Sequence, residues 1–294
     1  MALVTSFSVG RLRVHALEAG LQRLDGGAMF GVVPRPLWQK RIAPDDRNRI
    51  PLAMRCLLVE HAEGPVLVDT GLGNKEDPKF HDIYGIENAG HAGPTQLEDA
   101  LAELGVRPAD IRWVINTHLH FDHAGGNTTR DAGRDAVRLS FPNATYVVQG
   151  GELAFARTAN ERTRASYLPP NYEPVAAAGK FRLLDGDEAI LPGIRARVTP
   201  GHVPWHQSIL LEDDGDTALF LGDVLPTHAH LPLPWIMGYD TEPMRTLESK
   251  RALLRDAVAG RWLFLFEHDA AIVGGRAVAG AREVELADVL HRTP

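Results

Sequence analysis

The sequence is poor in cysteine, in basic charge and in long apolar runs, and each shortage removes a class of protein. Cys56 is the only cysteine among 294 residues, which leaves no disulfide framework and no thiolate zinc cluster. A net charge of −7 gives no basic surface for nucleic acid. No stretch reaches the ~18 consecutive apolar residues of a membrane helix. Residues 1–20 lack a basic region followed by an apolar run, so we expect no signal peptide and a cytoplasmic protein.

The sequence does contain enough apolar residues for a large core, at 44% hydrophobic and 23% charged. Its length allows one large domain or two smaller ones. Residues 20–50 are rich in glycine and proline and show no period, so we expect a long loop there. Alternating or apolar runs predict strands within residues 7–20, 52–60, 64–71, 108–117, 144–149, 179–202, 206–225 and 262–269. Helical spacing predicts helices over residues 95–106, 242–260 and 281–292.

Polar side chains that can bind metals follow five of the predicted strands directly. They are Asp69 after "PVLV", His118 after "WVINT", His202 after "ARVTPG", Asp223 after "ALFLG" and His268 after "WLFLFE". In open α/β sheets, the loops that follow neighbouring strands converge at one edge and build the site there. The five positions therefore predict one common site.

The stretch "HLHFDH" carries the densest group of such residues. His118 and His120 alternate with Leu119, so on an extended segment their imidazoles point to the same side. Asp122 and His123 fall in the turn that follows and face a second point. Imidazole and carboxylate together suit zinc and similar divalent ions, although a surface cluster would read the same way. One turn does not complete a coordination shell, so a metal site requires distant ligands, and the candidates are His202, Asp223 and His268.

The ordered set "VDTG", "HLHFDH", "TPGH", "GD" and "HD" resembles the metallo-β-lactamase-fold hydrolases. The segments "HLHFDHAGGN" and "TPGHVPWHQSILLE" are most similar to the quorum-quenching lactonases that open N-acyl homoserine lactones. The resemblance implies one α/β domain over residues 1–294, a four-layer αβ/βα sandwich with two metals between the sheets. It implies His118, His120 and His202 at one metal, Asp122, His123 and His268 at the other, and Asp223 as the bridge. Asp69 is then either an orienting partner behind the ligands or a turn residue before Gly71.

Such a site predicts a dinuclear hydrolase that opens a small lactone or ester by attack of a metal-bridging hydroxide. Zinc is the expected metal, with manganese, cobalt or iron also compatible with these ligands. The resemblance implies that Asp122 passes a proton to the leaving group. The alternatives are an arylesterase or phosphotriesterase, a thioesterase resembling glyoxalase II, a non-catalytic metal-binding relative, and a diiron oxygen reductase, which would require glutamate at His120.

The sequence departs from the lactonase pattern at two places. These lactonases carry a tyrosine three residues after the bridging aspartate, where this chain has Pro226. We expect His228 to act as a catalytic hydrogen-bond donor in its place, or His230 to do so from the pocket, unless both lie on a solvent-facing loop. Glu267 stands where the late motif usually has glycine, and the sequence leaves open whether its carboxylate faces the site.

Large apolar side chains in several loops predict the wall of a substrate pocket. The predicted pocket residues are Met29, Phe30, Trp38, Phe121, Trp205, His230 and Trp235. Because large exposed aromatic side chains also mark partner surfaces, residues 20–50 equally fit a homodimer interface.

Overall fold

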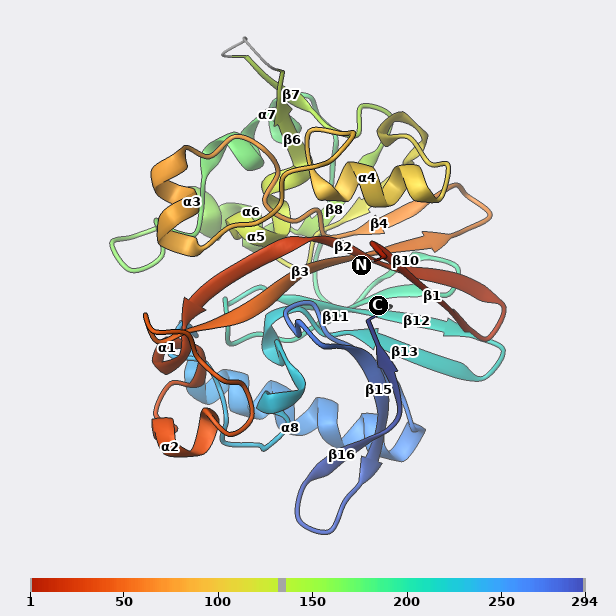
Figure 1. Ribbon diagram of the computed structural model, residues 1–294. Helices are drawn as coiled ribbons and strands as arrows, with labels where there is room; N and C mark the ends of the chain where they lie inside the picture. The colour runs from red at the N-terminus through yellow and green to blue at the C-terminus, as the bar shows by residue number, and fades with distance from the viewer. Residues whose placement is uncertain (1, 132–135, 293–294) are drawn as a thin grey trace.

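Two seven-stranded β-sheets form the centre of the structure, a computed structural model that describes residues 2–131 and 136–292 (Figure 1). The first sheet contains, in spatial order, β1 (Val4–Val9), β2 (Leu12–Asp25), β3 (Arg49–Glu60), β4 (Val66–Val68), β5 (Trp113–Ile115), β8 (Thr145–Gln149) and β9 (Phe181–Leu184). The second contains β10 (Ala189–Leu191), β11 (Ile194–Val198), β12 (Gln207–Asp213), β13 (Asp216–Phe220), β14 (Leu263–Leu265), β15 (Ile272–Ala279) and β16 (Val284–His291). A separate hairpin pairs β6 (Thr128–Arg130) with β7 (Val137–Leu139).

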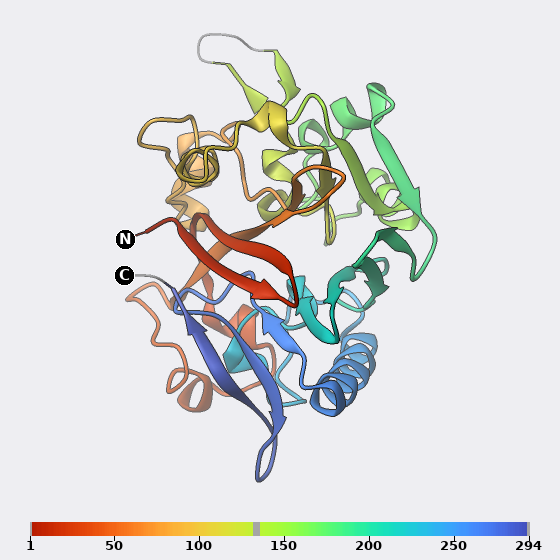
Figure 2. The same cartoon turned by 90° about the vertical axis from the view of Figure 1, so that its right-hand side faces the viewer.

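Helices cover the outer face of each sheet, as Figures 1 and 2 show from two directions. Over the first sheet lie α3 (Pro78–Tyr84), α4 (Gln96–Glu103), α5 (Phe121–Ala124), α6 (Gly150–Arg157) and α7 (Glu173–Ala177). On the side of the second lie α1 (Gly26–Phe30), α2 (Arg35–Trp38) and α8 (Pro243–Gly260). The 3-10 turns are η1 (Pro108–Asp110), η2 (Gly125–Asn127), η3 (Pro169–Asn171), η4 (Gly222–Val224) and η5 (His228–His230). The layers confirm the predicted αβ/βα sandwich.

Strand alternation produces the two buried faces of each sheet. In β2, Val14 and Ala16 face the core between the sheets, whereas Leu17 faces the helices and packs with Leu97 and Leu101 of α4. Successive strand residues point to opposite faces, so a strand covered on both sides becomes apolar throughout.

Among the described residues, no helix is both long and apolar enough to cross a membrane.

The predicted helices over residues 95–106 and 242–260 are confirmed, and their ends have local causes. Thr95 and Glu98 form a capping box at the start of α4. Pro243 occupies the first turn of α8, where its missing N–H costs nothing, and Arg261 ends the helix in the left-handed region.

Two element predictions are wrong. The segment predicted as a helix over residues 281–292 contains β16, which pairs antiparallel with β15 along the sheet edge. Its apolar spacing fits either structure, and the edge of the sheet supplies the hydrogen bonds that select the strand. Residues 20–50 are also more regular than a loop, because β2 extends to Asp25 and the short helices α1 and α2 follow before β3.

Strand ends gather at one edge of the sandwich, where they deliver the predicted site residues. β4 and β5 are parallel, so the residues after Val68 and Ile115 leave the first sheet together. β13 and β14 are also parallel and leave the second sheet together after Phe220 and Leu265. The loops carrying the metal-capable residues therefore meet between the two sheets.

Candidate metal centre

Four buried side chains form the first group of candidate ligands. His118, His120, His202 and Asp223 offer ligand atoms that all lie within 4.8 Å of one another. The His202 Nε2 atom lies 3.1 Å from His120 Nδ1 and 3.1 Å from Asp223 Oδ2. These residues come from three segments that are far apart in the sequence, as a complete coordination shell requires.

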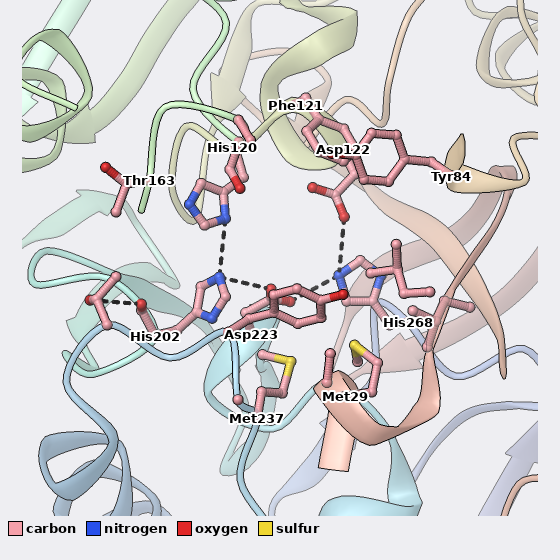
Figure 3. Close-up of a pocket in the computed structure, with 18 of the residues that line it drawn as sticks. Met29, Tyr84, His120, Phe121, Asp122, Thr163, His202, Asp223, Met237 and His268 are labelled. Atoms are coloured by element: carbon pink, nitrogen blue, oxygen red, sulfur yellow. Dashed lines mark hydrogen bonds and ion pairs between the residues drawn. The ribbon is translucent and has the colours of Figure 1, made fainter. Parts of the chain in front are cut away.

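Three further side chains form the second group. Asp122, His123 and His268 also present ligand atoms within 4.8 Å of one another. The Nε2 atoms of His123 and His268 are 3.2 Å apart, and Asp223 Oδ1 lies 2.9 Å from the His268 nitrogen and 3.5 Å from that of His123. Asp223 thus directs one oxygen to each group, and Figure 3 shows it between His202 and His268.

The donor set fits a pair of divalent cations. His118 Nε2 is buried and has no hydrogen-bond partner among the described residues. Buried polar atoms are normally paired, because an unpaired one loses its hydration without return. Imidazole nitrogens that face each other at about 3 Å, together with carboxylate oxygens, are what a cation with nitrogen and oxygen ligands would satisfy.

Charges within the site shift its pKa values in opposite directions. Burial, reinforced by the neighbouring histidines, lowers the pKa of His118 and His120 well below the ordinary value. Burial would also lower the pKa of His268, but Asp223 outweighs it and raises that pKa to about 9. Burial would raise the pKa of Asp223, yet His268 and His202 hold it well below its ordinary value. Asp223 is therefore a carboxylate in the folded protein.

Three of the candidate ligand imidazoles are oriented from behind by hydrogen-bond acceptors. Asp69 Oδ2 lies 3.1 Å from His123 Nδ1, and Asp69 also accepts from the backbone and hydroxyl of Thr117. His268 Nδ1 lies 2.7 Å from the backbone oxygen of Ala53. Such partners fix the tautomer and aim the other ring nitrogen at the metal. Asp69 is thus buried behind the loop that carries the candidate ligands.

Asp240 holds the third ligand, His202, and the sequence pattern does not reveal it. Its Oδ1 atom lies 3.0 Å from His202 Nδ1, and its side chain is buried. No motif spacing distinguishes Asp240 from a turn residue, because it lies on an irregular loop.

His206 is a second residue that the sequence does not single out. Its Nε2 accepts from the Asp223 backbone N–H at 3.0 Å, and its Nδ1 lies 2.8 Å from the Thr199 hydroxyl. Burial lowers the pKa of His206 to about 3, so the ring is neutral and able to accept. His206 therefore fixes the turn that presents Asp223.

Glu267 faces the site from behind rather than pointing away. Its Oε2 atom lies 3.0 Å from His123 Nδ1, on the same side of the ring as Asp69. Burial raises the pKa of Glu267 well above its ordinary value, although His123 opposes the shift. Asp69 and Glu267 therefore both lie at the Nδ1 side of His123, while its Nε2 atom is directed at Asp223.

A cavity of about 390 Å³ opens over the two groups (Figure 3). Met29 and Phe121 line it, as predicted, together with Tyr84, Met237 and Tyr239. This volume lies within the usual range for small-molecule sites, and most of the wall is apolar.

The other predicted pocket residues do not line this cavity. Phe30 stacks between Trp38 and His230 in a buried cluster that Trp235 also contacts. Both ring nitrogens of His230 are paired inside this cluster. The placement of Phe30, Trp38, His230 and Trp235 in the pocket is therefore wrong, because the cluster instead packs α1 and α2 against Ile50 and Leu52 of β3 and Ala229 of η5. Trp205 is also outside the lining and lies 41% exposed beside Gly151.

The expected role of His228 is not supported by its position. Its Nδ1 pairs with the Asp269 carboxylate, which also accepts from the His228 backbone N–H. His228 is not among the residues that line the cavity. The phenols that do line it belong to Tyr84 and Tyr239.

Replacing Asp240 with asparagine is expected to lower metal affinity about 10- to 100-fold, the usual effect of losing an outer partner of a histidine ligand. The change keeps a hydrogen-bond acceptor for His202 but removes the charge behind the ring. Competition against a chromophoric chelator measures the affinity. Asp214→Asn, at an exposed turn, is the matched control, and unchanged affinity in Asp240→Asn would show that Asp240 does not tune the site.

Comparison with known proteins agrees with this geometry. The family model described as the metallo-beta-lactamase superfamily matches residues 51–260. An N-acyl homoserine lactonase of Bacillus cereus is 32% identical over 172 residues, which are 57% of this chain and 61% of that relative. The matched segment thus spans less than two thirds of the relative's length.

Solved structures extend the likeness over nearly the whole chain. A probable metal-dependent hydrolase from Staphylococcus aureus has a TM-score of 0.86 and 32% identity, covering 97% of this chain and all of that one. An N-acyl homoserine lactone hydrolase, with N-hexanoyl-L-homoserine bound at its catalytic metal centre, has a TM-score of 0.66 and 26% identity, covering 90% of this chain and 95% of that one. With the family model matching most of its length and the ligand residues gathered as described, the chain belongs to the metallo-β-lactamase superfamily.

Proposed function

We propose that this protein is a hydrolase that uses two divalent metal ions to open lactones or related esters. The Asp223 carboxylate carries the proposal, because its two oxygens face two separate groups of buried ligands. Histidine and carboxylate ligands without thiolate suit zinc, and manganese, cobalt and iron also accept them. When bound, two such ions supply Lewis acidity toward a carbonyl oxygen and a water of lowered pKa.

The remaining chemistry belongs to the residues of the chain. Asp122 lines the cavity, and Gln22 Nε2 donates a hydrogen bond to its Oδ2 atom, which fixes the carboxylate. We assign to Asp122 the transfer of a proton to the leaving alkoxide. Burial raises the pKa of Tyr84 and raises that of Tyr239 to about 12, so both phenols remain protonated donors. They offer hydroxyls in the cavity, whereas Pro226 offers none.

The cavity favours a lactone or ester over a glutathione thioester. Glutathione carries two carboxylates, which call for several cationic side chains. Within the described lining, Arg162 is the only lysine or arginine. Relatives of this chain from Bacillus cereus and Rhizobium radiobacter are N-acyl homoserine lactonases, which supports lactones as the substrate class.

A substrate panel on metal-quantified protein tests the proposal. We expect kcat/KM for a γ-lactone to exceed that for an aryl ester, a paraoxon-like triester and S-lactoylglutathione by about 10-fold or more, which is 1.4 kcal/mol of transition-state discrimination. A higher value for the triester or thioester would replace the lactone with that substrate. No turnover of any of the four by fully loaded protein would favour a non-catalytic metal-binding relative.

A further inference from the structure

One arginine side chain lies in the wall of the cavity. Among the described residues that line it, Arg162 is the only lysine or arginine, while Asp122 and Asp223 lie at the candidate metal positions. Arg162 belongs to the segment between α6 and η3 and is exposed. Two bound divalent ions would neutralise both carboxylates, so Arg162 remains the one charged group available to a substrate away from the metals.

The Arg162 guanidinium is held in place by the opposite wall. Its Nη2 atom donates to the backbone oxygens of Gly238 at 2.9 Å and Asp240 at 3.3 Å. The Asp240 carboxylate in turn orients the ligand His202. The guanidinium therefore has a defined position relative to the first group of ligands. Its Nε and Nη1 atoms donate to no residue that the structure describes, which leaves part of the planar fork free.

The segment that carries Arg162 packs on the side of the first ligand group. The Phe121 N–H donates to the Ser166 oxygen at 2.9 Å, and the Tyr167 ring lies 4.6 Å from the His120 ring, centroid to centroid. Figure 3 shows Thr163 beside His120 and His202.

Apolar side chains line the side of the second ligand group, where the Tyr84 phenol also lies near Asp122 (Figure 3). Met29 lies toward His268 in Figure 3, and Leu52 pairs with Asp269, the residue after His268. Both Met29 and Leu52 line the cavity. The cavity therefore offers a cationic donor on the side of the first ligand group and apolar side chains on the side of the second.

We propose that Arg162 selects substrates whose scissile lactone or ester carries an arm with a second acceptor oxygen, either an amide carbonyl or a carboxylate. This inference rests on the proposed hydrolysis at the metal centre. The guanidinium donates to the arm, and the apolar part of the substrate lies against Met29 and Leu52. A charged donor makes stronger hydrogen bonds than a neutral one, and the preset position of the fork lowers the entropy lost on binding.

The test compares Arg162→Met with Arg164→Met. The control removes the same charge from a residue two positions along the chain, whose side chain does not line the cavity. Each metal-loaded protein is assayed on three γ-lactones, bearing a plain alkyl chain, an acylamino arm or a carboxylate arm. For Arg162→Met, we expect the ratio of kcat/KM on an arm-bearing lactone to that on the alkyl lactone to fall about 10-fold or more, mainly through KM. The arm whose lactone shows the larger fall in this ratio identifies the acceptor. Arg164→Met should keep the wild-type ratio.

The proposal is overturned if Arg162→Met keeps the wild-type ratio of kcat/KM between the arm-bearing and the alkyl lactones. This includes the case in which kcat/KM falls equally for all three lactones, because Arg162 then only holds the two loops together. Calorimetry with the ring-opened products, N-hexanoyl-homoserine and 4-hydroxydecanoate, separates this result from failure of the proposed function. If the wild type opens no lactone, the acceptor site is still supported when N-hexanoyl-homoserine binds more weakly to Arg162→Met but not to Arg164→Met. Equal binding to both variants, or none to the wild type, overturns it.

Discussion

Replacing Asp223 with alanine is expected to lower kcat at least about 1000-fold, the upper range for removal of one transition-state contact, because this carboxylate serves both metal positions. Its Oδ2 atom faces His202 and its Oδ1 atom faces His268, so the change removes a ligand from each group. We also expect fewer than two metal ions per chain. Elemental analysis and lactone hydrolysis on the same preparation measure both effects.

Two further variants distinguish loss of the Asp223 carboxylate from loss of folding. Asp223→Asn keeps the size of the side chain and should still lose metal, since a neutral amide is a weaker bridge than a carboxylate. Asp288→Asn removes an exposed carboxylate on β16 and should behave as the wild type. Circular dichroism verifies the fold of each variant. Full metal content together with full hydrolysis in Asp223→Ala would show that the bridge is assigned to the wrong residue.

Removing the metals with a chelator is expected to abolish hydrolysis and to lower the midpoint of thermal unfolding by roughly 10 °C, measured against protein with free metal at about 100 times its dissociation constant. The reason is that binding to the folded state alone stabilises it. Without cations, the buried His118 Nε2 atom has no hydrogen-bond partner among the described residues. Differential scanning calorimetry with and without added zinc provides the measurement.

The size of this midpoint difference should depend on pH. The folded pKa of His268 is raised from 6.5 to about 9, so its protonated pair with Asp223 stabilises the metal-free protein fully below pH 6.5 and is lost as the pH rises through 9. Metal binding needs the neutral imidazole, so affinity rises over the same interval. The midpoint difference between loaded and metal-free protein should therefore widen from pH 6.5 to 9.

A ligand variant and a surface variant complete the experiment. His118→Ala should reduce the response of the midpoint to zinc, whereas His291→Ala, at an exposed position on β16, should preserve it. A midpoint difference that narrows as the pH rises would contradict the assignment of His268 as a ligand paired with Asp223.

The local part of the site was accessible from the sequence because it depends on short spacing. His118, His120, Asp122 and His123 lie on one strand end and the turn that follows, so their relative directions follow from backbone geometry. The apolar run before His268 likewise marked a strand end. By contrast, Asp240, His206 and Arg162 acquire their roles through contacts between loops, and no local pattern encodes such contacts.

The aromatic residues also show that residue type alone does not determine tertiary contacts. Phe30 and Trp38 are equally suitable, as hydrophobic side chains, for a pocket wall, a dimer surface or a buried core. The packing of α1 and α2 against His230 and Trp235 decided the question in favour of the core. Met29, the neighbour of Phe30 in α1, belongs to the same buried cluster but also lines the cavity.

By itself, the sequence determined which donor atoms this protein has, their order along the chain and their delivery after strands, since these properties are carried by residue type and short-range periodicity. Only the tertiary structure decided that Asp223 stands between two groups of candidate ligands and that Tyr84 and Tyr239 rather than His228 face the cavity. It also decided that Arg162 is the one lysine or arginine among the described residues of the lining. The physical reason is that these positions depend on the pairing of β4 with β5 and of β13 with β14, and on the packing of the two sheets, which join residues far apart in the chain.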